Sequence, residues 1–234
     1  TNSFHAFLPQ IRQRGNRAII LDMTGDYVSR YYDKKTDIIL NPLDTRSLSW
    51  HPWVDCHLDS HYDVLAESLI QPKEGNHDPI WDKASRSLLK TALRKYAYQK
   101  KDNIEELTTF LMNSSAQEFE KFFKGTEAAT FASSTNEKTT HSIRSVLSSQ
   151  IEGLRHLEFS APQKKSEDNK DNASTMENLP TPAQLPPSEG VVETSFSIRK
   201  WVMGEKQDLG AQKNNKGGWL FITARADQRQ SLTP

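Results

Sequence analysis

Three short, continuous runs of apolar residues constrain the fold of this 234-residue chain more than any other feature. They cover residues 18–21, 38–40 and 219–223 and are bounded by polar or turn residues. A run of this length without alternation is typical of a strand that is buried on both faces, as in parallel sheets. Two runs lie near the start of the chain and one near its end. The sequence therefore predicts an α/β layer that is interrupted and later resumed.

An amphipathic helix is predicted before the first run. Apolar residues recur there at i, i+3, i+4 and i+7, namely Phe4, Phe7, Leu8 and Ile11. Gly15 is a suitable C-cap, so the helix should end near Arg14. Pro9 lies inside the pattern, where a missing N–H predicts a kink or a later helix start.

From about Ser49 the sequence carries repeated signals for helix starts, and these predict an all-α insertion over residues 49–157. Asp78 precedes Pro79, and three pairs have capping-box spacing: Asn103 with Glu106, Ser115 with Glu118, and Ser134 with Glu137. Apolar residues between His141 and Leu157 keep helical spacing over the longest stretch. Trp50 and Trp53 are expected to pack the insertion onto the sheet.

Residues 158–192 contain five prolines and few large apolar residues. Burial of so few apolar side chains cannot offset the conformational entropy lost on ordering, so a flexible surface excursion is predicted. After it, Ser197 is expected to cap a short helix before the third strand. The predicted organisation is an α/β segment at 1–48, a helical domain at 49–157, the excursion at 158–192 and a return to the α/β layer at 193–234.

Composition excludes several classes of protein. Lys plus Arg and Asp plus Glu number 30 each, so any contact with nucleic acid or anionic lipid must come from local patches. Cys56 is the only cysteine, and the histidines lack zinc-site spacing, as expected in a reducing cytosol. No run approaches the roughly 20 apolar residues of a membrane span. We expect both ends, at Thr1 and Pro234, to be cuts within a larger protein.

Five groups of residues, taken in order, resemble the conjugative coupling proteins of the TraD and TrwB type. They are residues 20–22 with 25–26, residues 37–44, Asp78-Pro79 with Trp81, residues 196–199 with Trp201, and residues 218–223. Together they extend over nearly the whole chain. The resemblance implies a RecA-like P-loop nucleotide-binding core, here partial, interrupted by an all-α insertion domain. Residues 1–48 and 193–234 would then belong to the nucleotide-binding domain.

The resemblance also implies a function. Such proteins are ATP- and Mg-dependent DNA translocases that link DNA and the relaxase, within the relaxosome, to a type IV secretion channel in conjugation. They assemble as hexamers at the cytoplasmic face of the bacterial inner membrane, through membrane segments outside this chain. The phosphate-binding loop and Walker B strand expected of them are absent from these 234 residues. We therefore expect the parent to be an ATPase and this chain to be inactive alone.

The nucleotide-site candidates follow from strand position and resemblance. Thr1 lies where the Mg-binding Ser or Thr of a P-loop would fall. Asp22 and Gly25 follow the first strand at the edge where open α/β sheets bind ligands, although Asp22 could instead cap the turn toward Gly25. Arg225 follows the third strand and could reach a γ-phosphate, either in its own subunit or as an arginine finger across a hexamer interface. It could also be an ordinary solvated arginine. Gln228 and Arg229 are weaker candidates.

Four basic residues are expected on one side of the helix after Pro79. They are Lys83, Arg86, Lys90 and Arg94, spaced by three and four residues. This basic stripe could contact DNA phosphates or a DNA-processing partner, or it could be a solvated helix face. Two other functions stay open: a hexameric DNA pump or helicase outside conjugation, and a helical adaptor that binds DNA or protein without ATPase activity.

Overall fold

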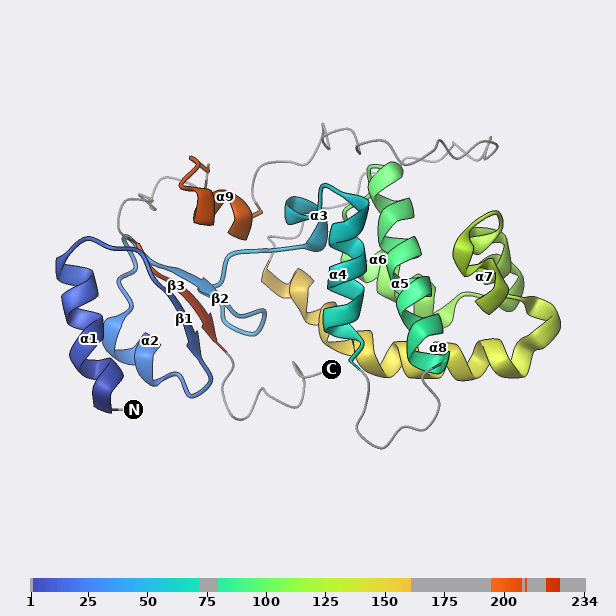
Figure 1. Ribbon diagram of the computed structural model, residues 1–234, viewed down its shortest axis with the longest axis horizontal. Helices are drawn as coiled ribbons and strands as arrows, with labels where there is room; N and C mark the ends of the chain where they lie inside the picture. Colours follow the sequence, from blue (N-terminus) through green and yellow to red (C-terminus); the bar gives the residue numbers. More distant parts are fainter. Residues whose placement is uncertain (1, 72–79, 161–194, 208, 210–217, 224–234) are drawn as a thin grey trace.

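A computed structural model describes residues 2–71, 80–160, 195–207, 209 and 218–223. They form two units that lie side by side (Figure 1): a small parallel sheet flanked by helices, and a helical bundle. The sheet unit takes its residues from both ends of the described chain. The three predicted strands therefore lie in one sheet, although the third follows the helical residues in sequence.

The sheet has the order β1-β3-β2, and both pairs of strands are parallel. Its strands are β1 (Ile19–Asp22), β2 (Ile38–Leu40) and β3 (Leu220–Thr223). Strand β3 is the last of the three in the sequence and the central one in the sheet, since it pairs with β1 on one side and β2 on the other. Its Leu220 and Phe221 are fully buried in apolar clusters on opposite faces. Because β3 has a strand on each side and helices over both faces of the sheet, its side chains are apolar without alternation.

Helices cover the two faces of the sheet (Figure 1). On one face α1 (Asn2–Gln13) and α2 (Asp26–Tyr31) enclose an apolar cluster with Leu8, Val28 and Trp219. On the other face α9 (Ile198–Met203) packs Trp201, beside Phe196, onto Ile38 and Leu220. Helix α2 was not predicted, since the residues after β1 read only as a turn.

Helix α1 ends as predicted. Gly15 has a φ of +69°, its N–H donates to the Arg12 carbonyl at 2.9 Å, and the Asn16 N–H donates to the Ile11 carbonyl at 3.1 Å. This pair of bonds is the Schellman arrangement of a helix C-terminus. The helix runs on through Pro9 and begins at Asn2, so the proline does not move its start.

The helical unit is built around its longest helix, α5. Its helices are α3 (Pro52–Asp55), α4 (Asp59–Leu69), α5 (Ile80–Tyr98), α6 (Ile104–Asn113), α7 (Ala116–Phe123) and α8 (Glu137–Ile151). Short 3-10 turns lie at Glu127–Phe131, Ser134–Asn136 and Glu152–Ser160. Leu88, Leu89 and Ala92 of α5 are fully buried against α4 and α8. The apolar face predicted after His141 is confirmed by the burial of Ile143, Leu147 and Ile151.

Two of the three predicted capping boxes match the structure. The Asn103 side chain accepts the Glu106 N–H, and Ser115 with Glu118 forms the full reciprocal box. The third prediction, Ser134 with Glu137, is wrong. Ser134 instead donates its hydroxyl and backbone N–H to the Glu120 carboxylate, and a 3-10 turn precedes α8. The Asp78-Pro79 signal and residues 161–192 of the predicted excursion lie outside the described residues.

Trp53, one of the two tryptophans near the start of the helical unit, does not pack that unit onto the sheet as expected. Trp53 lies in the core of the helical unit, where its ring stacks on Tyr96 at 6.1 Å and its Nε1–H donates to the Leu93 carbonyl at 3.0 Å. Trp50 donates its Nε1–H to Asp55 at 2.7 Å. Burial of an indole with its N–H satisfied places Trp53 in a local core.

Candidate functional site at the carboxyl edge of the sheet

Three polar residues stand at the carboxyl ends of the three parallel strands. Asp22 ends β1, Thr223 ends β3, and Asn41 follows β2. Asp22 and Thr223 are partners in the strand register, and the Asn41 amide donates to the Thr223 hydroxyl at 3.1 Å. All three are buried. Open α/β sheets bind ligands outside this edge, so these residues mark the candidate site.

The Asp22 carboxylate organises the turn that follows β1. One oxygen accepts the Gly25 N–H at 2.8 Å and both the N–H and the hydroxyl of Thr24 at 3.2 Å. The other accepts the Val28 N–H, in the first turn of α2, at 2.8 Å. These are the contacts of the turn-capping interpretation of Asp22. Four donors already occupy the two oxygens, and all of them belong to the turn after β1 and the start of α2.

Gly25 allows this turn to form. Its φ is +82°, a left-handed conformation that costs other L-residues free energy. An added Cβ would meet no atom within 4 Å among its surroundings, so the glycine is needed for its backbone conformation. The space beside the turn is therefore open to an approaching group. This agrees with its place among the predicted nucleotide-site residues without testing it.

Asn41 links β2 to β3 and was missed by the sequence reasoning as a site residue. Its side-chain oxygen accepts the Leu43 N–H at 3.0 Å, and its backbone N–H donates to the Ser47 hydroxyl at 2.9 Å. Thr223 was likewise not singled out. One sequence signal existed for both, since each is the first polar residue after an apolar run, as Asp22 is. Thr1, Arg225, Gln228 and Arg229 lie outside the described residues.

At the opposite, amino edge of the sheet, Asp37 is fully buried and paired with Arg12. The guanidinium donates to both carboxylate oxygens at 2.7 Å and lies 3.7 Å from the centre of the Trp219 ring. Burial alone would raise the pKa of Asp37. Hydrogen bonds from Arg12 and from the backbone of Trp219 and Asp33 outweigh it and hold this pKa below its usual value. Asp37 therefore joins α1, β2 and β3 at an edge remote from the candidate site.

The basic stripe does lie along one side of α5, but three of its four members have partners within the helical unit. Arg86 donates to the Ile70 carbonyl at 2.7 Å. Lys90 lies 3.1 Å from both Asp63 and Glu127. Arg94 pairs with Glu127 and, at 3.4 Å, with Asp59. Lys83 is exposed. Most of the stripe thus joins α5 to α4 and to the turn after α7.

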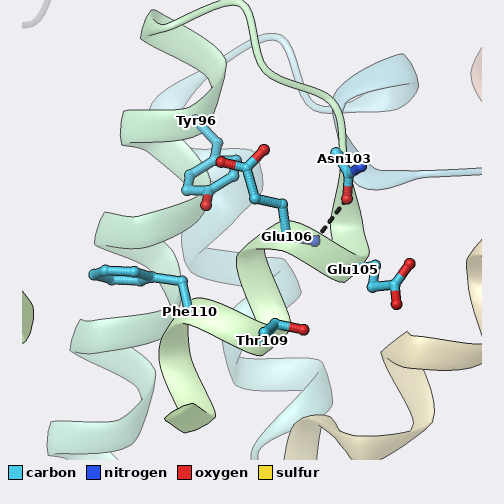
Figure 2. Close-up of a pocket in the computed structure, with 6 residues that line it drawn as sticks. All are labelled: Tyr96, Asn103, Glu105, Glu106, Thr109 and Phe110. Atoms are coloured by element: carbon cyan, nitrogen blue, oxygen red, sulfur yellow. Dashed lines mark hydrogen bonds between the residues drawn. The ribbon is translucent and has the colours of Figure 1, made fainter. Parts of the chain in front are cut away.

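A shallow hollow on the helical unit lies between α5 and the start of α6 (Figure 2). Its lining residues are Tyr96, Asn103, Glu105, Glu106, Thr109 and Phe110. Lys101 lies at 2.6 Å from Glu106 and 5.4 Å from the centre of the Tyr96 ring. Glu105 and Glu106 disfavour a phosphate in this hollow, and Lys101 offsets one of the two negative charges.

Among the described residues, no group of three or more His, Cys, Asp or Glu is arranged to hold a metal ion. No helix in the described ranges is long and apolar enough to cross a membrane.

Comparison with known proteins identifies relatives over the whole chain. The family model of the type IV secretion-system coupling protein DNA-binding domain matches residues 1–234. Coupling protein TraD of Escherichia coli (strain K12) is 30% identical over 223 residues, which are 95% of this chain and 26% of TraD. The chain thus spans about a quarter of the length of this curated relative.

Solved structures with the same fold bear the name TrwB. The unbound bacterial conjugative coupling protein TrwBdeltaN70 matches with a TM-score of 0.64 and 26% identity, covering 94% of this chain and 42% of that one. TrwB in complex with the ATP analogue ADPNP matches with a TM-score of 0.62 and 26% identity, over 92% of this chain and 42% of that one. TrwB in complex with ADP and Mg²⁺ matches with a TM-score of 0.61 and 27% identity, covering 92% of this chain and 41% of that one.

Proposed function

We propose that this chain, which belongs to the type IV secretion-system coupling protein family, is the middle part of an ATP-driven motor that moves DNA toward a conjugative secretion channel. Membership in the family and similarity to TraD and TrwB extend over nearly all of the chain. The motor activity is a proposal, because the chain spans only part of the length of its relatives.

The observation that carries the proposal is the alignment of Asp22, Thr223 and Asn41 at the carboxyl edge of the parallel sheet. This edge is the ligand edge of open α/β sheets, and TrwB structures contain ADPNP or ADP with Mg²⁺. We infer that ATP and Mg²⁺ bind beside this edge in the parent protein. Asp22 would position the turn at Gly25, Thr1 would ligate Mg²⁺, and Arg225 would meet the γ-phosphate across a subunit boundary.

The domain division follows from the packing. The two apolar clusters of the sheet combine residues before Ser49 with residues after Ser195, whereas the helical unit has a core of its own. This supports a RecA-like nucleotide-binding domain made of residues 1–48 and 193–234, with an all-α domain at 49–157 inserted into it. Of the excursion predicted at 158–192, residues 158–160 belong instead to the 3-10 turn Glu152–Ser160, and the rest lies outside the described residues.

The remaining assignments rest on the family. Its model is described as DNA-binding, which supports DNA as the substrate of the parent. The relaxase, the components of the secretion channel, a homo-hexamer and anchoring at the cytoplasmic face of the inner membrane are further proposals. The helical unit would meet DNA or relaxase. Its exposed Lys83 is the member of the basic stripe best placed for phosphate contact.

A paired measurement tests the motor. The 234-residue chain should show no ATP turnover, because it contains no P-loop sequence. The full-length parent should hydrolyse ATP, and DNA should stimulate it. Robust turnover by the chain alone would contradict the proposed division of catalytic parts. A parent that binds DNA without any turnover would instead support the adaptor. Strand separation without transfer of DNA between cells would support the helicase.

A further inference from the structure

The sheet unit and the helical unit have separate apolar cores. Trp53 and Tyr62 belong to the helical core, whereas Phe196 and Trp201 belong to a core on the sheet. Figure 1 shows α9 above the sheet with the segment from β2 to α3 running toward the helices. Most polar contacts between the units, within the described residues, are made by one carboxylate, that of Asp55 at the end of α3. Two more lie beside it: the Phe196 N–H donates to the Ser49 carbonyl at 2.8 Å, and the Arg199 guanidinium lies 3.4 Å from the His61 ring.

Asp55 accepts four hydrogen bonds. One oxygen accepts from the Ser197 hydroxyl at 2.6 Å and the Arg199 N–H at 3.1 Å. The other accepts from the Ile198 N–H at 3.1 Å and the Trp50 indole at 2.7 Å. Three of these donors lie more than 140 residues later in the chain. The carboxylate of one unit therefore holds the first turn of a helix that belongs to the other.

Helix α9 is fixed to the sheet unit by its own contacts. The side chains of Phe196 and Trp201 are buried on the sheet, in one apolar cluster with Ile38 and Leu220. The Gln207 side chain makes two hydrogen bonds to the backbone of Ser197. Its oxygen accepts the Ser197 N–H and its nitrogen donates to the Ser197 carbonyl, both at 2.8 Å. Ser197 also caps α9 by accepting the Lys200 N–H at 2.9 Å. One side of α9 is thus anchored by apolar packing and the other by hydrogen bonds to Asp55.

We propose that α9 is a clasp that sets the orientation of the helical unit on the sheet, and that the contact between Asp55 and Ser197 is the point at which this clasp opens. Local opening takes place where few apolar contacts are lost, and a polar joint between two complete cores meets that condition. Hinges commonly lie at the ends of elements, as residues 49–56 do. The proposal concerns this chain alone and does not require nucleotide or DNA.

The test compares distances between the units. Cysteines introduced as Lys34→Cys on the sheet unit and Lys138→Cys on α8 would carry spin labels, since both lysines are exposed. Burial raises the pKa of Cys56 to about 11, so this native thiol stays protonated and reacts slowly at neutral pH. The pulsed electron resonance distance distribution between the labels then reports the orientation.

Asp55→Asn is the decisive variant, because its amide nitrogen would replace one acceptor oxygen. It would then face either the Arg199 N–H or the Ile198 N–H and the Trp50 indole, none of which can accept a hydrogen bond. We expect the distance distribution to widen about twofold and amide exchange in α9 to speed up about tenfold. Ser197→Ala removes the hydroxyl that donates to Asp55, so it should also widen the distance distribution and speed amide exchange in α9. If Asp55→Asn does not fold, the result for Ser197→Ala tests the proposal instead.

Ser115→Ala is the matched control, since it removes a serine cap of the same kind inside the helical unit. It should leave the distance distribution unchanged while speeding exchange in α7. Unchanged distances in both Asp55→Asn and Ser197→Ala would overturn the clasp. Equal widening in all three variants would overturn it as well, because the effect would then come from general loss of stability.

Discussion

Arg12 and Asp37 form a two-bond ion pair at the amino edge of the sheet, with both N–O distances at 2.7 Å. The carboxylate is fully buried, while the guanidinium is 30% exposed and stacks on Trp219. A single carboxylate so connects the N-terminal helix, the edge strand β2 and the central strand β3. Sequence alone placed Asp37 in a family motif without a role, and the structure gives it one in the framework of the sheet.

Replacing Asp37 by Asn should destabilise the sheet unit by about 3 kcal/mol, because one partner of a buried pair is lost and the other keeps its charge. Urea unfolding would measure the difference. The control is Lys101→Met, which breaks an ion pair whose two side chains are about half exposed and should cost less than about 1 kcal/mol. Equal effects of the two changes would contradict a framework role for Asp37.

The same pair predicts a pH dependence. The pKa of Asp37 is lower in the folded protein than in the unfolded chain, so the unfolded state binds its proton first as the pH falls. The stability from Asp37 is therefore present above about pH 4, near the unfolded pKa, and is lost as the pH falls toward the folded value. Thermal unfolding measured between about pH 3 and 6 spans the unfolded pKa of an aspartate. As the pH falls through this range, Asp37→Asn should lose less stability than the unchanged protein. A slope equal to that of the unchanged protein would contradict the assignment.

Gly218 and Gly25 should respond differently to alanine. A Cβ at Gly218 would lie 2.0 Å from the Thr36 carbonyl oxygen, a backbone atom that cannot move away without disturbing β2 and β3. Gly25→Ala meets open space and carries only the left-handed backbone cost of about 1–2 kcal/mol. We expect Gly218→Ala to reduce the yield of folded protein or to cost more than Gly25→Ala. Circular dichroism melting would rank them, and the reverse order would refute the close approach.

The basic stripe needs a test that separates DNA contact from stability. Lys90→Glu and Arg94→Glu would set new carboxylates against Asp63, Asp59 and Glu127, so they should destabilise the helical unit. Lys83→Glu changes an exposed residue and should alter stability by less than about 0.5 kcal/mol. If the stripe contacts DNA, Lys83→Glu weakens affinity and lowers its salt dependence. Unchanged affinity in fluorescence anisotropy would favour the solvated-face interpretation.

The parts of the fold that could be predicted were those encoded by neighbouring residues. The three strands, the end of α1 and the caps at Asn103, Ser115 and Ser197 all have local signals. Helix α2 was missed because the residues after β1 show no apolar residues at helical spacing. The contact that stabilises its first turn, from the Val28 N–H to the Asp22 carboxylate, spans the preceding turn. The cap at Ser134 was wrong because Glu120, 14 residues away, takes its donors.

The candidate site was predictable only to the level of an edge. Asp22 could be placed at the carboxyl end of a strand, but which groups it binds depends on how the chain turns back toward Val28. The partners of the stripe and of Asp55 come from elements far apart in sequence. Long-range pairing of this kind leaves no periodic pattern, so only the folded chain reveals it.

The central position of β3 also dictates an order of events during synthesis. Strands β1 and β2 both pair with β3, which follows β2 by about 180 residues. At about 5–20 residues per second, they leave the ribosome roughly 10–40 seconds before their partner exists. The helical unit, whose contacts are complete by residue 160, can form in that interval. Protease treatment of stalled nascent chains ending before Gly218 should therefore spare the helices and cleave residues 2–48, which stay unpaired until β3 has been synthesised.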